Sequence, residues 1–338
     1  MIKINVRKLI AFGKNSYVIS LPKQWVDKNR LKKGDLVSLD EKKDGLLLRV
    51  KENGLIEDEP MRVVVNSDNK SLGQLKTEIV SAYLNNYNII EVVSKDLKTN
   101  ALRIRDMLRD LTGLEIINQS STRIVAKDII NVNNISIKTL IRRMDNITRS
   151  MMLDTVECFD GIDHADNIEY IDEEVNRLHF LAYRIIRSGL SDFRTANSSE
   201  TSPLKLHSSH TVTKRIERIA DNTKLISRYL RETKLDKKWK NELKIIFDGI
   251  RETYNDVMKA YYTGDEKMAL EIEEKRNEKL ELCDTFFERH DHKHLRYNEE
   301  MGFCCFRDAC GATMKIIENM KGILYSIKYI ARTLIGGG

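Results

Sequence analysis

Apolar residues recur at every third or fourth position through most of the chain after residue 135, which is the period of helices that bury one face. Breaks at Gly161, Gly189 and Gly264 interrupt this pattern, as does a polar stretch at 191–203. The pattern predicts six helices, over residues 135–159, 168–190, 204–230, 239–262, 267–289 and 301–334. We therefore expect this part of the chain to form an all-α bundle.

The first fifty residues follow another pattern, in which short apolar runs alternate with turn signals. The pair Asp44-Gly45 is a strong hairpin signal, and Pro22 can open a short helix. The pattern predicts strands at 2–10, 17–21, 36–39 and 46–50, with a helix at 23–29. Because four such strands bury little apolar surface, the unit is expected to need a partner to complete its core.

The middle of the chain mixes the two patterns. Strands are expected at 62–65, 89–93, 115–117 and 122–127, with helices at 72–87 and 102–111. This order predicts a small α+β layer. The fold class is thus multidomain α+β, with domains expected at 1–52, 60–131 and 135–335.

The six expected helices repeat as two three-helix units, at about 135–233 and 238–335. Met144-Asp145 aligns with Phe247-Asp248, and the breaks at Gly161 and Gly264 keep the same spacing. Repeats of this size predict a pseudo-symmetric helical bundle.

Several of these helices carry oxygen-bearing side chains four residues apart, which lie on one face of a helix. They are Asp172 with Asn176, Glu217 with Asp221, Glu274 with Glu278, and Glu318, which is followed four residues later by Gly322. The repeat aligns Asp172 with Glu274 and Glu217 with Glu318. Facing helices with such pairs can form an oxygen-rich metal site, but spacing alone favours exposed acids in salt bridges.

Composition narrows the class of protein. The chain is 41% hydrophobic and 32% charged and has only three prolines, which suits long helices with packed cores. It has no run of about 18 apolar residues and no signal-peptide core at its N-terminus, so we expect a cytoplasmic protein without membrane insertion. The five cysteines lie in helical patterns without a Cys-x-x-Cys pair, as expected for reduced thiols: Cys158, Cys283, Cys304, Cys305 and Cys310.

Positive charge is concentrated at the N-terminus. Residues 1–34 carry nine Lys or Arg and one acid, Asp27, a net charge of +8, against +6 for the whole chain. This density indicates a polyanionic partner, and a solvated face is the alternative.

The order of turns and strands at the N-terminus resembles the AbrB/SpoVT swapped-hairpin family over roughly residues 1–52. The resemblance is carried by Arg7-Lys8-Leu9, Gly13, Ser16, Ser20-Leu21-Pro22-Lys23-x-Trp25 and Leu31-x-x-Gly34-Asp35. It implies a homodimer of interlaced chains and DNA binding, for which Arg7, Lys8, Lys14 and Lys23 are the candidate phosphate contacts. The alternative is a module that only dimerises.

The residues around the acids resemble PhoU, the phosphate uptake regulator family, over about 135–335. Arg215-Ile216-Glu217-Arg218-Ile219-Ala220-Asp221 is similar to its Glu-Arg-Ile-x-Asp motif, and Ile171-Asp172-Glu173-Glu174-Val175-Asn176-Arg177-Leu178 to the partner motif. The resemblance implies a divalent or trivalent metal ion (Mg, Zn or Fe) at a site made of Asp172, Asn176, Glu217 and Asp221. It implies a second site made of Glu274, Glu278 and Glu318, where Gly322 stands in place of an acid.

The combined order looks like that of archaeal phosphate regulators of PhoU type with an AbrB-like head. The expected function is therefore a phosphate-responsive transcriptional regulator, a DNA-binding dimer that controls phosphate homeostasis through a metal-binding sensor domain. The alternative is a protein-interaction modulator of a phosphate transporter or sensor kinase without DNA binding. Expected partners are DNA, a second copy of the chain, and transporter components or a sensor protein.

Enzymatic activity is not expected. Neither a phosphate-binding loop nor a Ser-His-Asp order is visible, and a metal-dependent phosphohydrolase would need a base and an open coordination position that cannot be identified. The three histidines at 290, 292 and 294 are expected in an inter-helix loop, because Arg289, Lys293 and Arg296 oppose a bound cation.

Overall fold

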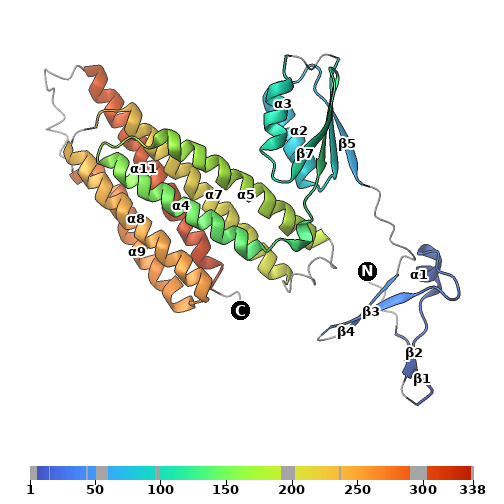
Figure 1. The fold of residues 1–338 in the computed structure, drawn as a ribbon. Helices are drawn as coiled ribbons and strands as arrows, with labels where there is room; N and C mark the ends of the chain where they lie inside the picture. Colours follow the sequence, from blue (N-terminus) through green and yellow to red (C-terminus); the bar gives the residue numbers. More distant parts are fainter. Residues whose placement is uncertain are drawn as a thin grey trace. The chain divides into compact units, whose positions relative to one another are not determined.

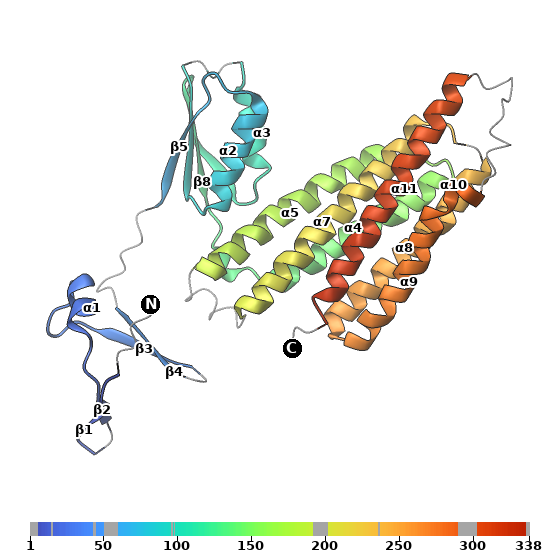
Figure 2. The ribbon, with the colours of Figure 1, turned by 180° about the vertical axis from the view of Figure 1, so that it is seen from behind.

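The computed structural model describes residues 6–14, 16–42, 45–50, 60–95, 97, 99–191, 202–235, 237–289 and 303–335. The chain divides into two compact units, Met1–Pro60 and Met61–Gly338. Figures 1 and 2 show the elements of both from opposite sides. The histidines at 290–294 and the side chains of Cys304, Cys305 and Cys310 lie outside the described residues. Among the described helices, none combines the length and the apolar character needed to cross a membrane.

The N-terminal unit consists of two hairpins and one helix (Figure 1). β1 (Ile10–Phe12) pairs antiparallel with β2 (Ser16–Val18), and β3 (Val37–Lys42) with β4 (Gly45–Val50), while α1 (Lys23–Lys28) lies between the hairpins in sequence. Gly13 takes a φ of 73° in the first turn, which glycine adopts without strain.

The first expected strand is longer than the observed one. The expected strand spans 2–10, whereas β1 begins at Ile10 and residues 6–9 are in no strand. Residues 1–5 lie outside the described part. The expected strand at 17–21 is likewise only Ser16–Val18. The two strands are short because only three residue pairs join them: Ile10 with Val18, Ala11 with Tyr17, and Phe12 with Ser16.

The α+β layer begins the second unit. Its elements are β5 (Arg62–Asn66), α2 (Leu72–Leu84), β6 (Ile89–Val93), α3 (Ala101–Arg109), β7 (Leu114–Gln119) and β8 (Arg123–Asp128). The sheet order is β5-β6-β8-β7; β5 and β6 are parallel because α2 carries the chain back, and the other neighbours are antiparallel. Ser71 starts α2 with a capping box to Gln74. The expected α+β order and the hairpin of β7 with β8 are confirmed.

The remaining elements form the helical domain. After a short turn, η1 (Val132–Asn134), they are α4 (Ile137–Phe159), α5 (Ala165–Ser191), α7 (Pro203–Glu232), α8 (Lys237–Thr263), α9 (Glu266–Asp284), α10 (Phe286–Arg289) and α11 (Phe303–Arg332). Gly161 and Gly264 have positive φ values after α4 and α8, which confirms them as helix ends. The helix expected at 267–289 is interrupted at Thr285, so that α9 and α10 are separate helices. Phe286, the first residue of α10, is buried with its ring against that of Trp239.

One hydrophobic core runs through this domain. α7 and α11 pack along each other, α4 and α5 pack against α7, and α8 and α9 pack against α11 (Figures 1 and 2). The core buries Cys158 and Cys283, and both are free thiols, as expected. The two three-helix groups of the sequence repeat are thus two packing groups, joined by contacts of α7 with α11 and of α4 with α8.

A buried arginine joins the helical domain to the α+β layer. Arg184 of α5 is 2% exposed and forms an ion pair with Asp128 at the end of β8. Its Nε donates to Asn86 Oδ1 at 2.8 Å, and its guanidinium lies over the Tyr83 ring, 4.7 Å from the centroid. Because a buried charge is stable only when it is paired, this contact fixes the end of the layer against α5.

Candidate functional site

Four of the expected ligands meet between α5 and α7. Asp172 lies between Ile168 and Val175 on the inward face of α5, and its side chain is only 3% exposed. Asn176, one turn later, donates from Nδ2 to Asp172 Oδ2 at 3.2 Å. Glu217 and Asp221 project from α7, and both are half-buried. The acids that the family resemblance assigns to one site therefore share one seam between two helices.

Lys224 joins two of these acids. Its Nζ donates to Asp172 and, at 3.0 Å, to Asp221 Oδ1. Burial lowers the pKa of Lys224, but these hydrogen bonds outweigh the burial, so the pKa is raised overall. Lys224 was not among the residues expected at this site, although its position three residues after Asp221 is the spacing of a helix ion pair.

Negative charge at the seam exceeds positive charge. Burial, followed by the charges of Asp221 and Asp172, raises the pKa of Glu217 to about 7. Burial also raises the pKa of Asp172 against the opposing effect of Lys224, and its Oδ1 has no hydrogen-bond partner. Three carboxylates around one ammonium leave room for a further proton or cation.

The described side chains do not already form a metal cage. Across the described ranges, no group of three or more His, Cys, Asp or Glu is arranged so that it could hold one ion. The ammonium of Lys224 occupies the position between Asp172 and Asp221 that a shared cation would need. A metal ion at this seam would thus have to displace Lys224.

His179 extends the seam by one further turn of α5. It lies seven residues after Asp172 and three after Asn176, and so faces the same side of the helix. Burial, with smaller contributions from His210 and Lys214, lowers its pKa to about 4, so the imidazole is neutral at pH 7. Its Nδ1 has no hydrogen-bond partner. A neutral imidazole can ligate a metal ion, and only its position on the face of Asp172 could have indicated this from the sequence.

The second expected set of ligands is exposed. Glu274, Glu278 and Glu318 all face solvent on α9 and α11. The buried residues of α9 include Ala269, Ile272 and Arg276, and this face turns Glu273 rather than Glu274 towards α11. Glu273 is bound there by Arg276 Nη2 at 2.9 Å and, more distantly, by Lys328 Nζ at 3.7 Å.

The register of the repeat in α11 explains why acids meet between α5 and α7 but not in the second half of the bundle. Buried positions of α7 recur 104 residues later in α11: Ile216, Ala220 and Thr223 correspond to Met320, Leu324 and Ile327. By this register the positions of Glu217 and Asp221 are taken by Lys321 and Tyr325. The sequence repeat instead aligns Glu217 with Glu318, three positions away, because acids rather than buried faces are matched there. The second half therefore carries a cation and a phenol at the positions where the first half carries acids.

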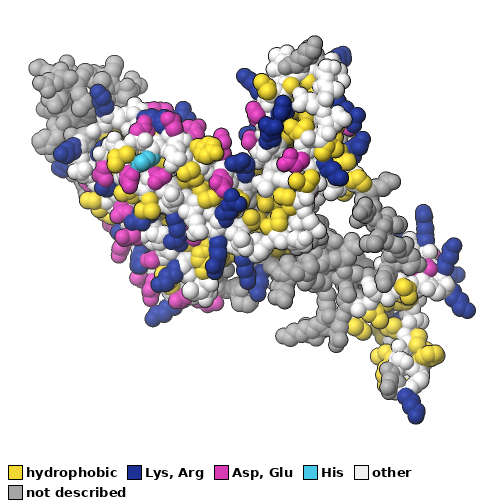
Figure 3. All heavy atoms as spheres, viewed as in Figure 1, with side chains coloured by type: hydrophobic (Ala, Val, Ile, Leu, Met, Phe, Trp, Pro, Cys, Tyr) yellow, Lys and Arg dark blue, Asp and Glu magenta, His cyan; other side chains and the backbone are white. Residues whose placement is uncertain are grey.

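The expected DNA-contacting residues lie on the surface of the N-terminal unit. Arg7, Lys8, Lys14 and Lys23 are all exposed. Lys14 lies in the turn between β1 and β2, and Lys23 begins α1. Figure 3 shows dark blue Lys and Arg side chains projecting from this unit next to yellow apolar ones.

Comparison with family models gives two matches. Residues 10–56 match antidote-toxin recognition MazE, a bacterial antitoxin family, and residues 141–230 match the PhoU domain. Searches of curated proteins and of solved structures returned no significant match. The matches cover β1 to β4 and the three helices α4, α5 and α7, and both families are regulatory. They confirm the expected combination of an N-terminal module of a DNA-binding type with a PhoU domain, while α8 to α11 lie outside the match.

Proposed function

We propose that this chain, which joins a MazE/AbrB-like module to a PhoU domain, is a phosphate-responsive transcriptional regulator. In this proposal two copies form a DNA-binding homodimer through the N-terminal unit. The helical domain senses phosphate status with the help of a bound metal ion and thereby controls phosphate uptake.

The surface of the N-terminal unit is the observation that carries the proposal. None of its described side chains is buried, and Phe12, Tyr17 and Leu46 are 69%, 72% and 71% exposed. A unit of this size cannot leave so much apolar surface in water and remain folded. A second copy of the same unit is the partner that fits, because the resemblance to swapped hairpins supplies an interlaced pairing.

Charge supports DNA as the ligand of this dimer. Residues 1–34 carry a net charge of +8, which pairing of two copies doubles. Phosphate contacts from Arg7, Lys8, Lys14 and Lys23 would release counterions, so binding would weaken steeply with salt.

The metal part of the proposal concerns the seam of α5 and α7. Asp172, Glu217 and Asp221, with the amide oxygen of Asn176, would hold a divalent or trivalent ion such as Mg, Zn or Fe. Support comes from the buried Oδ1 of Asp172, which has no hydrogen-bond partner, and from the excess of acids over cations at the seam. A bound ion would neutralise this charge. The proposal is restricted to this one site, because Glu274, Glu278 and Glu318 are exposed.

Genome-wide DNA pull-down and salt titration test the DNA part. We expect the full-length protein to retain DNA at low salt, to lose it steeply as salt rises, and to bind more weakly after the double substitution Arg7→Ala and Lys8→Ala. The matched control removes two exposed charges elsewhere, Arg103→Ala with Arg109→Ala on α3, and should leave DNA binding unchanged. An intact dimer that fails to bind any DNA at low salt would instead favour the modulator of a transporter or kinase.

A further inference from the structure

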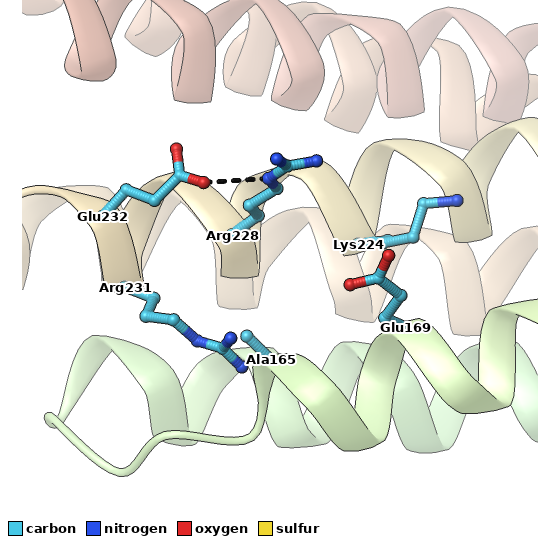
Figure 4. Close-up of a pocket in the computed structure, with 6 residues that line it drawn as sticks. All are labelled: Ala165, Glu169, Lys224, Arg228, Arg231 and Glu232. Atoms are coloured by element: carbon cyan, nitrogen blue, oxygen red, sulfur yellow. Dashed lines mark hydrogen bonds and ion pairs between the residues drawn. The ribbon is translucent and has the colours of Figure 1, made fainter.

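A small cavity lies beside the carboxylate seam, between the start of α5 and the last turns of α7. It has a volume of about 210 Å³ and is lined by Ala165, Glu169, Lys224, Arg228, Arg231 and Glu232. Figure 4 shows Arg231 reaching from α7 towards Ala165, and Glu169 pointing from α5 towards α7. The cavity is smaller than the pockets that enclose drug-sized ligands, so it suits a small ion.

Three cations follow one face of α7 at this cavity. Lys224, Arg228 and Arg231 stand four and three residues apart, a spacing at which like charges repel. Arg228 and Arg231 pair with exposed acids: Arg228 Nε binds Glu232 Oε1 at 2.9 Å, and Arg231 binds Asp163 at 3.0 Å and Asp166 at 2.8 Å. Exposed ion pairs of this kind contribute little, so an incoming anion can exchange with them. Lys224 is instead held by the buried Asp172 and by Asp221.

The start of α5 also lies at this cavity. α5 is 27 residues long and begins at Ala165, the residue that lines the cavity. The first turn of a helix has amide groups without partners inside the helix and the positive end of its dipole. Asp163 Oδ1 already accepts from the Ala165 amide at 3.1 Å and Asp166 stands in this first turn, so a bound oxyanion would take the place of these acids. Planar guanidinium groups such as those of Arg228 and Arg231 match the oxygens of an oxyanion in pairs.

We propose that this cavity binds inorganic phosphate through Lys224, Arg228, Arg231 and the first turn of α5. This inference rests on the proposed function and supplies the site for the signal that the function assumes. Lys224 both lines the cavity and bridges Asp172 and Asp221, so an anion in the cavity draws on the same ammonium that holds the acids together. Binding of phosphate and the state of the carboxylates are therefore linked, and linkage of this kind is reciprocal.

Isothermal titration of full-length protein with inorganic phosphate, in the absence of DNA, tests the inference. Arg228→Gln removes a charge-assisted hydrogen bond and should weaken binding about tenfold. Glu232→Gln removes the acid that competes for Arg228 and should strengthen binding about threefold. Arg251→Gln is the matched control, because Arg251 forms a similar helix ion pair with Asp248 at 2.7 Å away from the cavity and should leave binding unchanged.

The opposite signs of the two variants make the test decisive, since a merely structural effect would not strengthen binding. Equal affinity in all variants, or no binding of phosphate, would overturn the inference. A phosphoserine peptide is the second arm: we expect it not to bind, and binding of the peptide without inorganic phosphate would also overturn it. DNA retention is measured in a separate experiment. A protein that binds DNA but not phosphate would overturn only the phosphate site, and one that binds phosphate but not DNA would overturn only the DNA-binding proposal.

Discussion

Replacing Glu217 by Gln should make the metal-free protein more stable at pH 8. Burial, followed by the charges of Asp221 and Asp172, raises the pKa of this carboxyl from 4.5 to about 7. Between these two values the folded protein holds a proton that the unfolded chain releases. The stability contributed by that proton is fully present below about 4.5 and is lost as the pH rises through about 7. Gln carries no charge at any pH, so the variant does not suffer this loss.

The size of the effect follows from the shift. A difference of about 2.5 pKa units corresponds to about 3 kcal/mol of unfolding free energy at most. Because Glu217 is only half-buried, solvent screening reduces this to about 1–2 kcal/mol. At pH 5 most of the gain should have disappeared.

Urea unfolding followed by circular dichroism, with a chelator present, measures this at both pH values. Glu274→Gln makes the same chemical change on an exposed residue and should shift stability by less than about 0.5 kcal/mol at either pH. A Glu217→Gln variant that is less stable than the parent at pH 8, or that differs by the same amount at pH 5, would refute the reasoning.

The parent protein and the Glu217→Gln variant also test the metal proposal. A bound ion stabilises the folded state by mass action, and Glu217 is one of its expected ligands. Addition of Mg, Zn or Fe should therefore stabilise the parent more than Glu217→Gln. An equal gain in both would contradict a site that includes Glu217.

Two further substitutions probe the rest of the molecule. Arg184→Met should cost about 3–5 kcal/mol of unfolding free energy, because it leaves Asp128 buried without its partner. Arg143→Met, at an exposed ion pair, is the control and should cost little. A loss below about 1 kcal/mol for Arg184→Met would contradict the described contact. If the proposed dimer forms through the N-terminal unit, Phe12→Lys should convert it to a monomer in sedimentation experiments without altering the melting of the helical domain. A dimer that persists in this variant would show that this surface is not the interface.

The order of elements and most helix ends could be predicted from the sequence. Apolar spacing is a local property, and glycines such as Gly161 and Gly264 end helices wherever they occur at such positions, so these features need no knowledge of the fold. Asp172, Glu217 and Asp221 could also be selected, because a four-residue spacing and a family motif are both legible in one chain.

The partners of those acids were decided by tertiary structure. Lys224 reaches Asp172 across two helices, and nothing in the spacing of residues 52 positions apart indicates that contact. Likewise the charge of Arg184 would predict an exposed residue, whereas Asn86 and Asp128 from the α+β layer allow it to be buried.

The second half of the bundle shows the physical reason most clearly. Matching of acids selected Glu274, but packing turns Glu273 inward and puts Lys321 and Tyr325 where α7 has its acids. Successive residues of a helix point in directions about 100° apart, so an error of one position exchanges a buried face for a solvated one. The sequence determines that these helices exist and where they end, whereas the rotation of each helix is set by how its apolar face packs against the others.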